Sequence, residues 1–173
     1  ARRHFALSPP RIEAEGGKYP WAAGEPEPFI RQLLPPTDVL DLELAEVIAT
    51  PGIRDLYNEG LNHGTGIVLS AHAIKIPASE ATWTHWRATF PLYKASIYKI
   101  AGEVQAREDL LRLVAPMVDQ PDLPWAVMGL GEGAARMRTA LTALGSKLIY
   151  GYLDEPAVPS QPSLRALITQ FSV

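Results

Sequence analysis

Ser96-Ile97-Tyr98-Lys99-Ile100-Ala101 is a short apolar run that carries a single lysine. Alternation along a strand places Lys99 on one face of this run and Tyr98 and Ile100 on the opposite face. Segments with helical spacing lie on both sides of the run. Short apolar runs that alternate with such segments indicate β and α elements in turn, and therefore a parallel sheet.

The same alternation extends along the whole chain. Six runs are predicted to form strands, at residues His4–Ser8, Asp38–Leu42, Gly66–Ala71, Ser96–Ala101, Trp125–Leu130 and Lys147–Leu153. Six segments are predicted to form helices, at residues Pro28–Leu34, Leu44–Tyr57, Ser79–Tyr93, Glu103–Met117, Glu132–Leu144 and Ser163–Phe171. Pro51 is expected to break or restart the second helix. Since no linker or low-complexity stretch interrupts the pattern, we expect residues 1–173 to form a single domain.

Composition excludes several classes of function. With 173 residues, 47% of them hydrophobic, the chain can bury one sizeable core. No run approaches the roughly 20 apolar residues of a membrane-spanning helix. A net charge of -3 offers no broad basic surface, so we expect no direct contact with nucleic acid. The absence of cysteine excludes disulfides, thiolate metal ligands and a cysteine nucleophile. The chain starts at Ala1 and not at Met, and we interpret it as a fragment of a longer protein.

Two patterns have a structural interpretation beside a functional one. Trp83, Trp86 and Phe90 fall on one helical face, which favours packing in the core or at an interface. The stretch 129–134, Gly-Leu-Gly-Glu-Gly-Ala, loosely matches the dinucleotide fingerprint G-x-G-x-x-G/A. That fingerprint normally lies in the first βα turn, and here it comes late in the chain. A tight turn between a strand and a helix explains the glycines equally well.

Lys99 and His72 are the residues with the clearest chemical meaning. A lysine on the inner face of a sheet loses solvation, and its neutral amine can attack a carbonyl carbon to form a Schiff base. The alternative is an edge-strand lysine that points to water. His72 ends the run 68–72, at the strand end where β/α folds place catalytic groups. The other histidines have no supporting context, and the spacing of His, Asp and Glu suggests no metal site.

Six motifs follow one another in a fixed order along the chain. They are Arg11-Ile12-Glu13-Ala14-Glu15-Gly16-Gly17, Asp41-Leu42-Glu43, Leu69-Ser70-Ala71-His72, Ile97–Ala101 with Arg107–Leu110, Met128–Arg138 with Gly145-Ser146, and Val158-Pro159-Ser160-Gln161. This collinear set resembles the type I 3-dehydroquinate dehydratases across nearly the whole chain. The resemblance implies an incomplete (β/α)8 TIM-type barrel of about six parallel strands that lacks the first strands.

The resemblance also implies a role for each site residue. Lys99 would form an imine with the ketone of the substrate, His72 would act as general acid and base, and Glu15 would orient His72. Arg138 would pair with the substrate carboxylate, as a planar fork against a planar anion. Arg11 and Gln161 would complete the polar contacts. No cofactor and no metal are expected.

Departures from the family pattern shape the functional hypothesis. The chain begins after the Glu-x-Arg segment of the family, and Ala157 stands where the family usually has a serine. Glu132 replaces a residue that is often basic or polar. Ala1-Arg2-Arg3 and Lys18-Tyr19-Pro20 look closer to the fungal forms, which include the arom enzyme and the quinate repressor of filamentous fungi. We therefore expect a non-catalytic, dehydratase-like region of a transcriptional repressor of quinate metabolism.

Three hypotheses differ in what they predict for added substrate. The repressor region would sense a quinate-pathway metabolite without turnover. An active type I dehydratase from a multidomain shikimate-pathway enzyme would turn the substrate over, and a structural scaffold would ignore it. Because the missing strands would leave sheet edges unpaired, we expect a protein partner or a homodimer there. The expected location is the nucleus or the cytoplasm.

Overall fold

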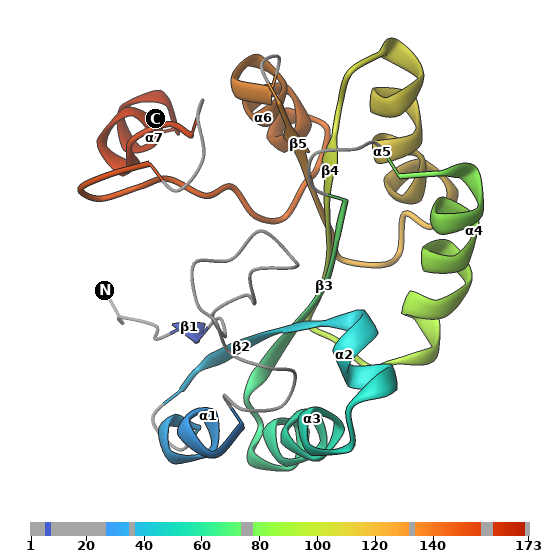
Figure 1. Ribbon diagram of the computed structural model, residues 1–173. Helices are drawn as coiled ribbons and strands as arrows, with labels where there is room; N and C mark the ends of the chain where they lie inside the picture. Colours follow the sequence, from blue (N-terminus) through green and yellow to red (C-terminus); the bar gives the residue numbers. More distant parts are fainter. Residues whose placement is uncertain are drawn as a thin grey trace. The chain divides into compact units, whose positions relative to one another are not determined.

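Strands and helices alternate along the chain in a computed structural model (Figure 1). The structure describes residues 6–7, 27–34, 37–73, 78–131, 134–156 and 161–171. The strands are β1 (Ala6–Leu7), β2 (Val39–Glu43), β3 (Gly66–Ala73), β4 (Ile97–Glu103) and β5 (Trp125–Leu130). The helices are α1 (Glu27–Leu33), α2 (Leu44–Ala49), α3 (Pro51–His63), α4 (Glu80–Thr89), the 3-10 helix η2 (Phe90–Leu92), α5 (Arg107–Asp119), α6 (Ala134–Ala143) and α7 (Leu164–Phe171).

The strands form a sheet in the order β1-β2-β3-β4-β5. β2 pairs in parallel with both β1 and β3, and Glu43 of β2 lies opposite Ser70 of β3. In β2, Leu40 and Leu42 are buried on the face opposite to Asp41, as the period of two requires. The α/β class with a parallel sheet is therefore confirmed.

The prediction of six strands is not confirmed by the described residues. The segment Lys147–Leu153 runs beside β5, where the Lys147 backbone N–H donates to the carbonyl of Trp125 at 2.9 Å. Two residues further along β5, the N–H of Val127 donates to the side-chain hydroxyl of Ser146 and not to a backbone carbonyl of the segment. Further along, Tyr152 forms only an isolated bridge with Ser163. A hydroxyl that replaces backbone pairing interrupts the ladder, so the segment is not a strand.

The helix boundaries follow local chemistry. The expected break at Pro51 is confirmed, since α2 ends at Ala49 and α3 begins at Pro51, where the missing N–H is tolerated. α5 begins at Arg107 and not at Glu103, because the Asp109 carboxylate accepts from the N–H groups of residues 105 and 106 and fixes the helix start there. No helix in the described ranges is long and apolar enough to cross a membrane.

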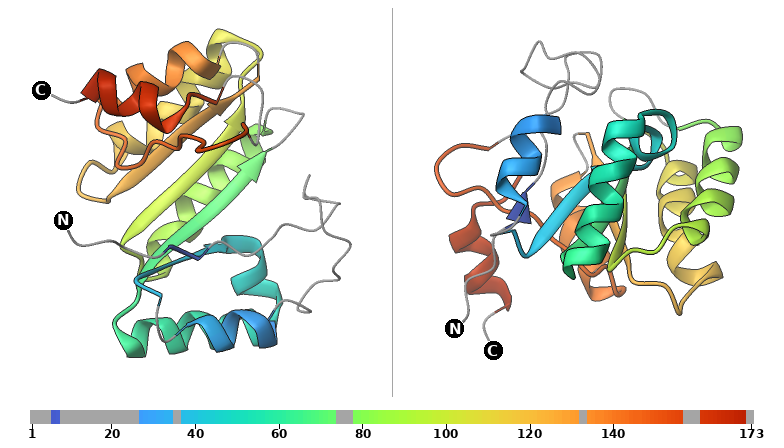
Figure 2. Two further views of the ribbon diagram at one scale, coloured as in Figure 1. Left: turned by 90° about the vertical axis from the view of Figure 1, so that its left-hand side faces the viewer. Right: turned by 90° about the horizontal axis from the view of Figure 1, so that it is seen from below.

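Contacts divide the chain into two compact units. The first, unit 1, comprises Ala1–His72 and Thr84–Lys99, and the second, unit 2, comprises Ala73–Trp83 and Ile100–Val173. In unit 1, α3 packs against α1, α2 and β2, and Figure 2 shows α1 and α3 side by side. Its fully buried side chains include Leu40, Ile53 and Phe90. The ring of Phe90 meets Tyr98 edge to face at 5.9 Å.

Unit 2 has a core of its own around β5. α5 and α6 both pack against this strand, and its buried side chains include Leu113, Trp125 and Leu141. The aromatic residues Trp83, Trp86 and Phe90 are all buried, as their helical spacing predicts, with Trp83 in unit 2 and the other two in unit 1. That residues 1–173 form a single domain stays a prediction.

Candidate active site

A buried ion pair joins β4 to β2 in unit 1. The Lys99 ammonium lies 2.6 Å from Oδ2 of Asp41, and each of these side chains is only 8% exposed. Lys99 is therefore not the solvent-exposed edge lysine of the alternative interpretation. A charge held away from water has to be paired to persist there, and Asp41 supplies the opposite charge.

Ser70 of β3 completes the surroundings of Asp41. Its hydroxyl donates to Oδ1 of Asp41 at 2.6 Å, and the residue is 2% exposed. Two longer contacts lead from the same oxygen, to the carbonyl of Leu42 at 3.2 Å and to Oε2 of Glu43 at 3.5 Å. Both oxygens of Asp41 are thus held, one by the ammonium and one by the hydroxyl.

A second pair lies two residues further along the same strands. Nδ1 of His72 lies 2.7 Å from Oε2 of Glu43, and Oε1 of Glu43 accepts from the backbone N–H of His72 at 3.2 Å. The His72 side chain is 8% exposed and that of Glu43 is 21% exposed. A carboxylate at Nδ1 favours the tautomer in which Nδ1 carries the proton and leaves Nε2 to exchange protons with a substrate.

Strand register brings these groups together. Asp41 and Glu43 are two residues apart on β2, and Ser70 and His72 are two residues apart on β3, so each pair of residues shares one face of the sheet. The arrangement combines an amine in a water-poor place with a histidine oriented by a carboxylate. Such a set can form an imine with a carbonyl compound and move a proton on the adjacent carbon.

The other predicted site residues belong to unit 2 or lie outside the described residues. Arg138 and Gln161 belong to unit 2, where Arg138 is 7% exposed and Gln161 is half-buried. Among the described residues, Nε of Arg138 has no hydrogen-bond partner, and burial lowers the pKa of its guanidinium below the usual value. Arg11 and Glu15 lie outside the described residues. The roles predicted for all of these residues stay predictions.

Sequence reasoning assigned no role to three of the clustered residues. The resemblance gives the orientation of His72 to Glu15, which lies outside the described residues, and the structure adds Glu43 as a partner at Nδ1. Ser70 belongs to the histidine motif, which implies no separate role for it. The sequence contains one signal for these residues: two acidic residues, two apart, in an otherwise apolar strand. Because buried charges require partners, this pattern predicts that Asp41 and Glu43 each pair with another polar side chain.

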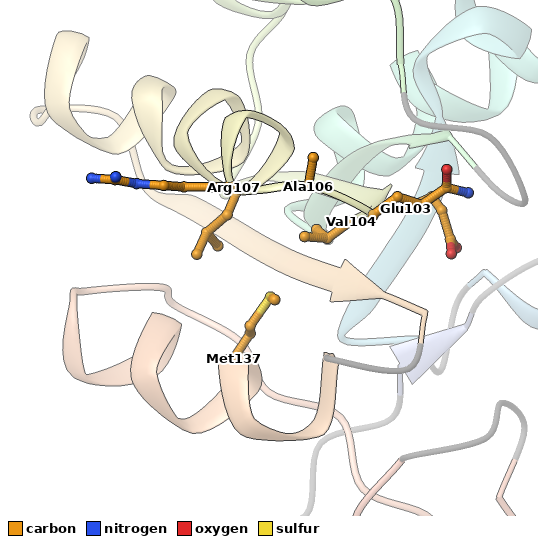
Figure 3. Close-up of a pocket in the computed structure, with 7 residues that line it drawn as sticks. Glu103, Val104, Ala106, Arg107 and Met137 are labelled. Atoms are coloured by element: carbon orange, nitrogen blue, oxygen red, sulfur yellow. The ribbon is translucent and has the colours of Figure 1, made fainter.

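Unit 2 contains a separate cavity of about 630 Å³ where β4 ends and α5 begins (Figure 3). It is lined by Glu103, Val104, Gln105, Ala106, Arg107, Leu110 and Met137. The Asp109 carboxylate accepts from the N–H groups of residues 105 and 106 just before α5, and its negative charge there makes this helix end less favourable for an anion. Gly131 comes directly after β5 with φ of 94°, which accounts for this glycine of the 129–134 stretch by backbone geometry.

Metal ligation has no visible candidate in the part of the chain that the structure describes. No group of three or more His, Asp or Glu side chains there is placed to hold an ion. Within the described ranges, the His72 and Glu43 pair is a hydrogen-bonded dyad and not part of a group of three such side chains.

Comparisons with known proteins converge on one family. Residues 7–173 match the family model described as type I 3-dehydroquinase. The 3-dehydroquinate dehydratase of Hydrogenobaculum sp. (strain Y04AAS1) is 30% identical over 159 residues, which is 91% of this chain and 69% of that protein. The 3-dehydroquinate dehydratase of Methanothrix thermoacetophila is 26% identical, over 92% of this chain and 66% of that protein.

A solved structure shows the same fold. The crystal structure of 3-dehydroquinate dehydratase from Geobacillus kaustophilus HTA426 superposes with a TM-score of 0.79 at 21% identity, and covers 98% of this chain and 69% of that one. At this level of identity the likeness concerns the fold alone.

These matches correct the functional expectation drawn from the sequence. The expectation of a non-catalytic repressor region is wrong, because the relatives that match are dehydratases, which are enzymes. The expectation that the chain is not an enzyme is wrong for the same reason. Ala157 and Glu132 lie outside the described residues, and the Lys99 and His72 pairs are intact. The chain belongs to the type I 3-dehydroquinate dehydratase family.

Proposed function

We propose that the protein containing this chain removes water from 3-dehydroquinate through an imine on Lys99. The observation that carries the proposal is the buried Lys99 ammonium, held 2.6 Å from Asp41 and beside the His72 and Glu43 pair. Family membership and the names of the relatives support the substrate. Because the chain spans 69% and 66% of those relatives, the activity belongs to the proposal.

The first step joins Lys99 to the substrate ketone. The ammonium must lose a proton before it can attack, and the Asp41 carboxylate is in direct contact with it. The neutral amine then adds to the carbonyl carbon, and loss of one water gives the imine. An imine withdraws electrons from the adjacent carbon and makes a proton there easier to remove.

The second step is the proton transfer by His72. With Glu43 at Nδ1, the Nε2 atom of His72 can take the proton from the carbon next to the imine. The same histidine can return that proton to the departing hydroxyl group, which leaves as water. Hydrolysis of the imine then frees the conjugated enone and restores the Lys99 amine.

Absorbance of the enone and borohydride trapping test the two steps separately. Incubation with 3-dehydroquinate is expected to give a steady rise in enone absorbance, and borohydride is expected to fix an adduct on Lys99 that mass spectrometry can locate. Lys99→Ala should abolish both signals. Lys147→Ala serves as the matched control, because Lys147 is exposed and belongs to unit 2. Enone formation that survives in Lys99→Ala would contradict the proposal.

A partner at a sheet edge also stays a proposal. Within the described residues, β1 has two residues and pairs with β2 alone. An end strand of this kind can accept a further strand from a second copy of the chain or from another protein. Sedimentation at several concentrations tests the homodimer, and a constant monomer mass would count against it.

A further inference from the structure

We propose that Ser70 is a positioning residue for the imine-forming lysine, acting through Asp41. The inference rests on the proposed function, and it assigns to Ser70 a role that neither the motif order nor the strand pattern predicts. The hydroxyl of Ser70 is the only described side-chain group besides Lys99 that bonds to Asp41 within 3 Å.

The single hydroxyl proton of Ser70 has one best acceptor. Its contact with Asp41 is 2.6 Å, against 3.2 Å to the Leu42 carbonyl and 3.5 Å to Glu43. A hydrogen bond to an ionised carboxylate is shorter and stronger than one to a neutral carbonyl. The proton therefore points to Asp41, and the bond is shielded from water because Ser70 is 2% exposed.

This bond fixes a direction that the backbone does not fix. The last torsion of an aspartate side chain is soft, so one contact leaves the carboxylate plane free to turn. Ser70 on Oδ1 and Lys99 on Oδ2 together define that plane. The long flexible side chain of Lys99 in turn takes its direction from Asp41. Loss of the hydroxyl would release the plane and, with it, the position of the amine.

Ser70 also lies between the two pairs of the site. Asp41 and Glu43 face it from β2, Lys99 lies beyond Asp41, and His72 follows on its own strand. The Oε2 atom of Glu43 that bonds to His72 is 3.5 Å from the Ser70 hydroxyl. One buried hydroxyl thus borders both the amine and the histidine side of the proposed reaction.

Removal and restoration of the hydroxyl test the role. Ser70→Ala is expected to slow borohydride-trapped imine formation with 3-dehydroquinate on the order of tenfold to a hundredfold, since a displacement of about 1 Å can cost up to about a hundredfold in rate. Ser70→Thr, which keeps a hydroxyl on a residue that strands accept, is expected to recover most of the rate. The matched control is Ser146→Ala, since Ser146 is also buried but its hydroxyl bonds only to backbone groups of unit 2. It should trap at the wild-type rate.

A substrate-free measurement reports the contact itself. In protein labelled with ¹³C-aspartate, the carboxyl resonance of Asp41 is assigned by its loss in Asp41→Asn. It is expected to move in Ser70→Ala, to return in Ser70→Thr and to stay in place in Ser146→Ala. A general loss of structure would move the other aspartate resonances as well.

The outcomes separate this inference from the proposed function. If the wild-type chain traps no adduct, the proposed function fails, and a positioning role in imine formation fails with it even if the Asp41 resonance responds. If the wild type traps and Ser70→Ala traps equally fast, only the Ser70 inference is overturned. An unmoved Asp41 resonance in Ser70→Ala, or a Ser70→Thr variant that folds but stays as slow as Ser70→Ala, overturns it too.

Discussion

Asp41→Asn is expected to destabilise the protein strongly, because it leaves a buried ammonium without its opposite charge. Lys99 and Asp41 are in contact at 2.6 Å and each side chain is 8% exposed. At that distance, with an effective dielectric constant of about 20, the attraction between two unit charges is about 6 kcal/mol. The desolvation of both groups offsets much of this attraction in the intact pair.

Removal of one partner costs more than the pair itself contributes. Breaking a buried pair typically costs about 3–5 kcal/mol, and the isosteric amide still offers one oxygen to Lys99, so we expect the lower end, about 3 kcal/mol. For a chain of this size, about 3 kcal/mol corresponds to a fall in Tm of roughly 6–12 °C. Lys99→Met combined with Asp41→Asn is expected to recover part of the loss, because no unpaired charge remains.

Urea unfolding of the two single variants and the double variant measures the coupling between the residues. The matched control is Glu80→Gln, which removes one of the two acidic partners of Arg112, in an exposed pair where about 0–1 kcal/mol is expected. A loss below about 1 kcal/mol in Asp41→Asn would refute the reasoning, since a surface pair would give the same result. Strict additivity of the two single changes would refute it equally.

Three further changes test other parts of the structure. Glu43→Gln removes the charge that orients His72, so enone formation should fall by about tenfold or more while the trapped lysine adduct persists; an unchanged rate would argue against the histidine role. Gly131→Ala should cost about 1–2 kcal/mol or more in urea unfolding, because φ is 94° and an added Cβ would lie 2.6 Å from Oε1 of Glu103; a neutral change would contradict this. Burial raises the pKa of the Tyr57 phenol, so the unfolded chain ionises first and stability should fall as pH rises above about 10, less steeply in Tyr57→Phe; parallel curves for the two proteins would refute it.

Strand alternation was enough to predict part of the site. It placed Lys99 within β4 and on the face opposite to Ile100, and the motif order singled out His72. β5 runs from Trp125 to Leu130 as predicted, since a short apolar run bounded by Pro124 and Gly131 favours a buried strand. These features depend on one strand at a time.

The features that depend on two strands could not be predicted in the same way. Glu43 is the partner of His72 because β2 and β3 pair in a register that sets Glu43 opposite Ser70. The residue types in the two strands do not predict that register. The prediction of a sixth strand at Lys147–Leu153 is not confirmed for a related reason. The Ser146 hydroxyl takes the place of a backbone hydrogen bond to β5, and the sequence does not reveal the rotamer of that side chain.

Asp41 and Glu43 make β2 a strand that tolerates no sliding. The neighbouring Leu40 and Leu42 are fully or almost fully buried on the opposite face of the strand. A shift of β2 by one residue would turn both carboxylates into the hydrocarbon interior and present two leucines to the ammonium and the imidazole. A shifted register is therefore destabilised in two ways, by the loss of leucine packing and by the burial of two carboxylates without partners. An adduct trapped on Lys99 would consequently indicate that β2 is paired in its native register.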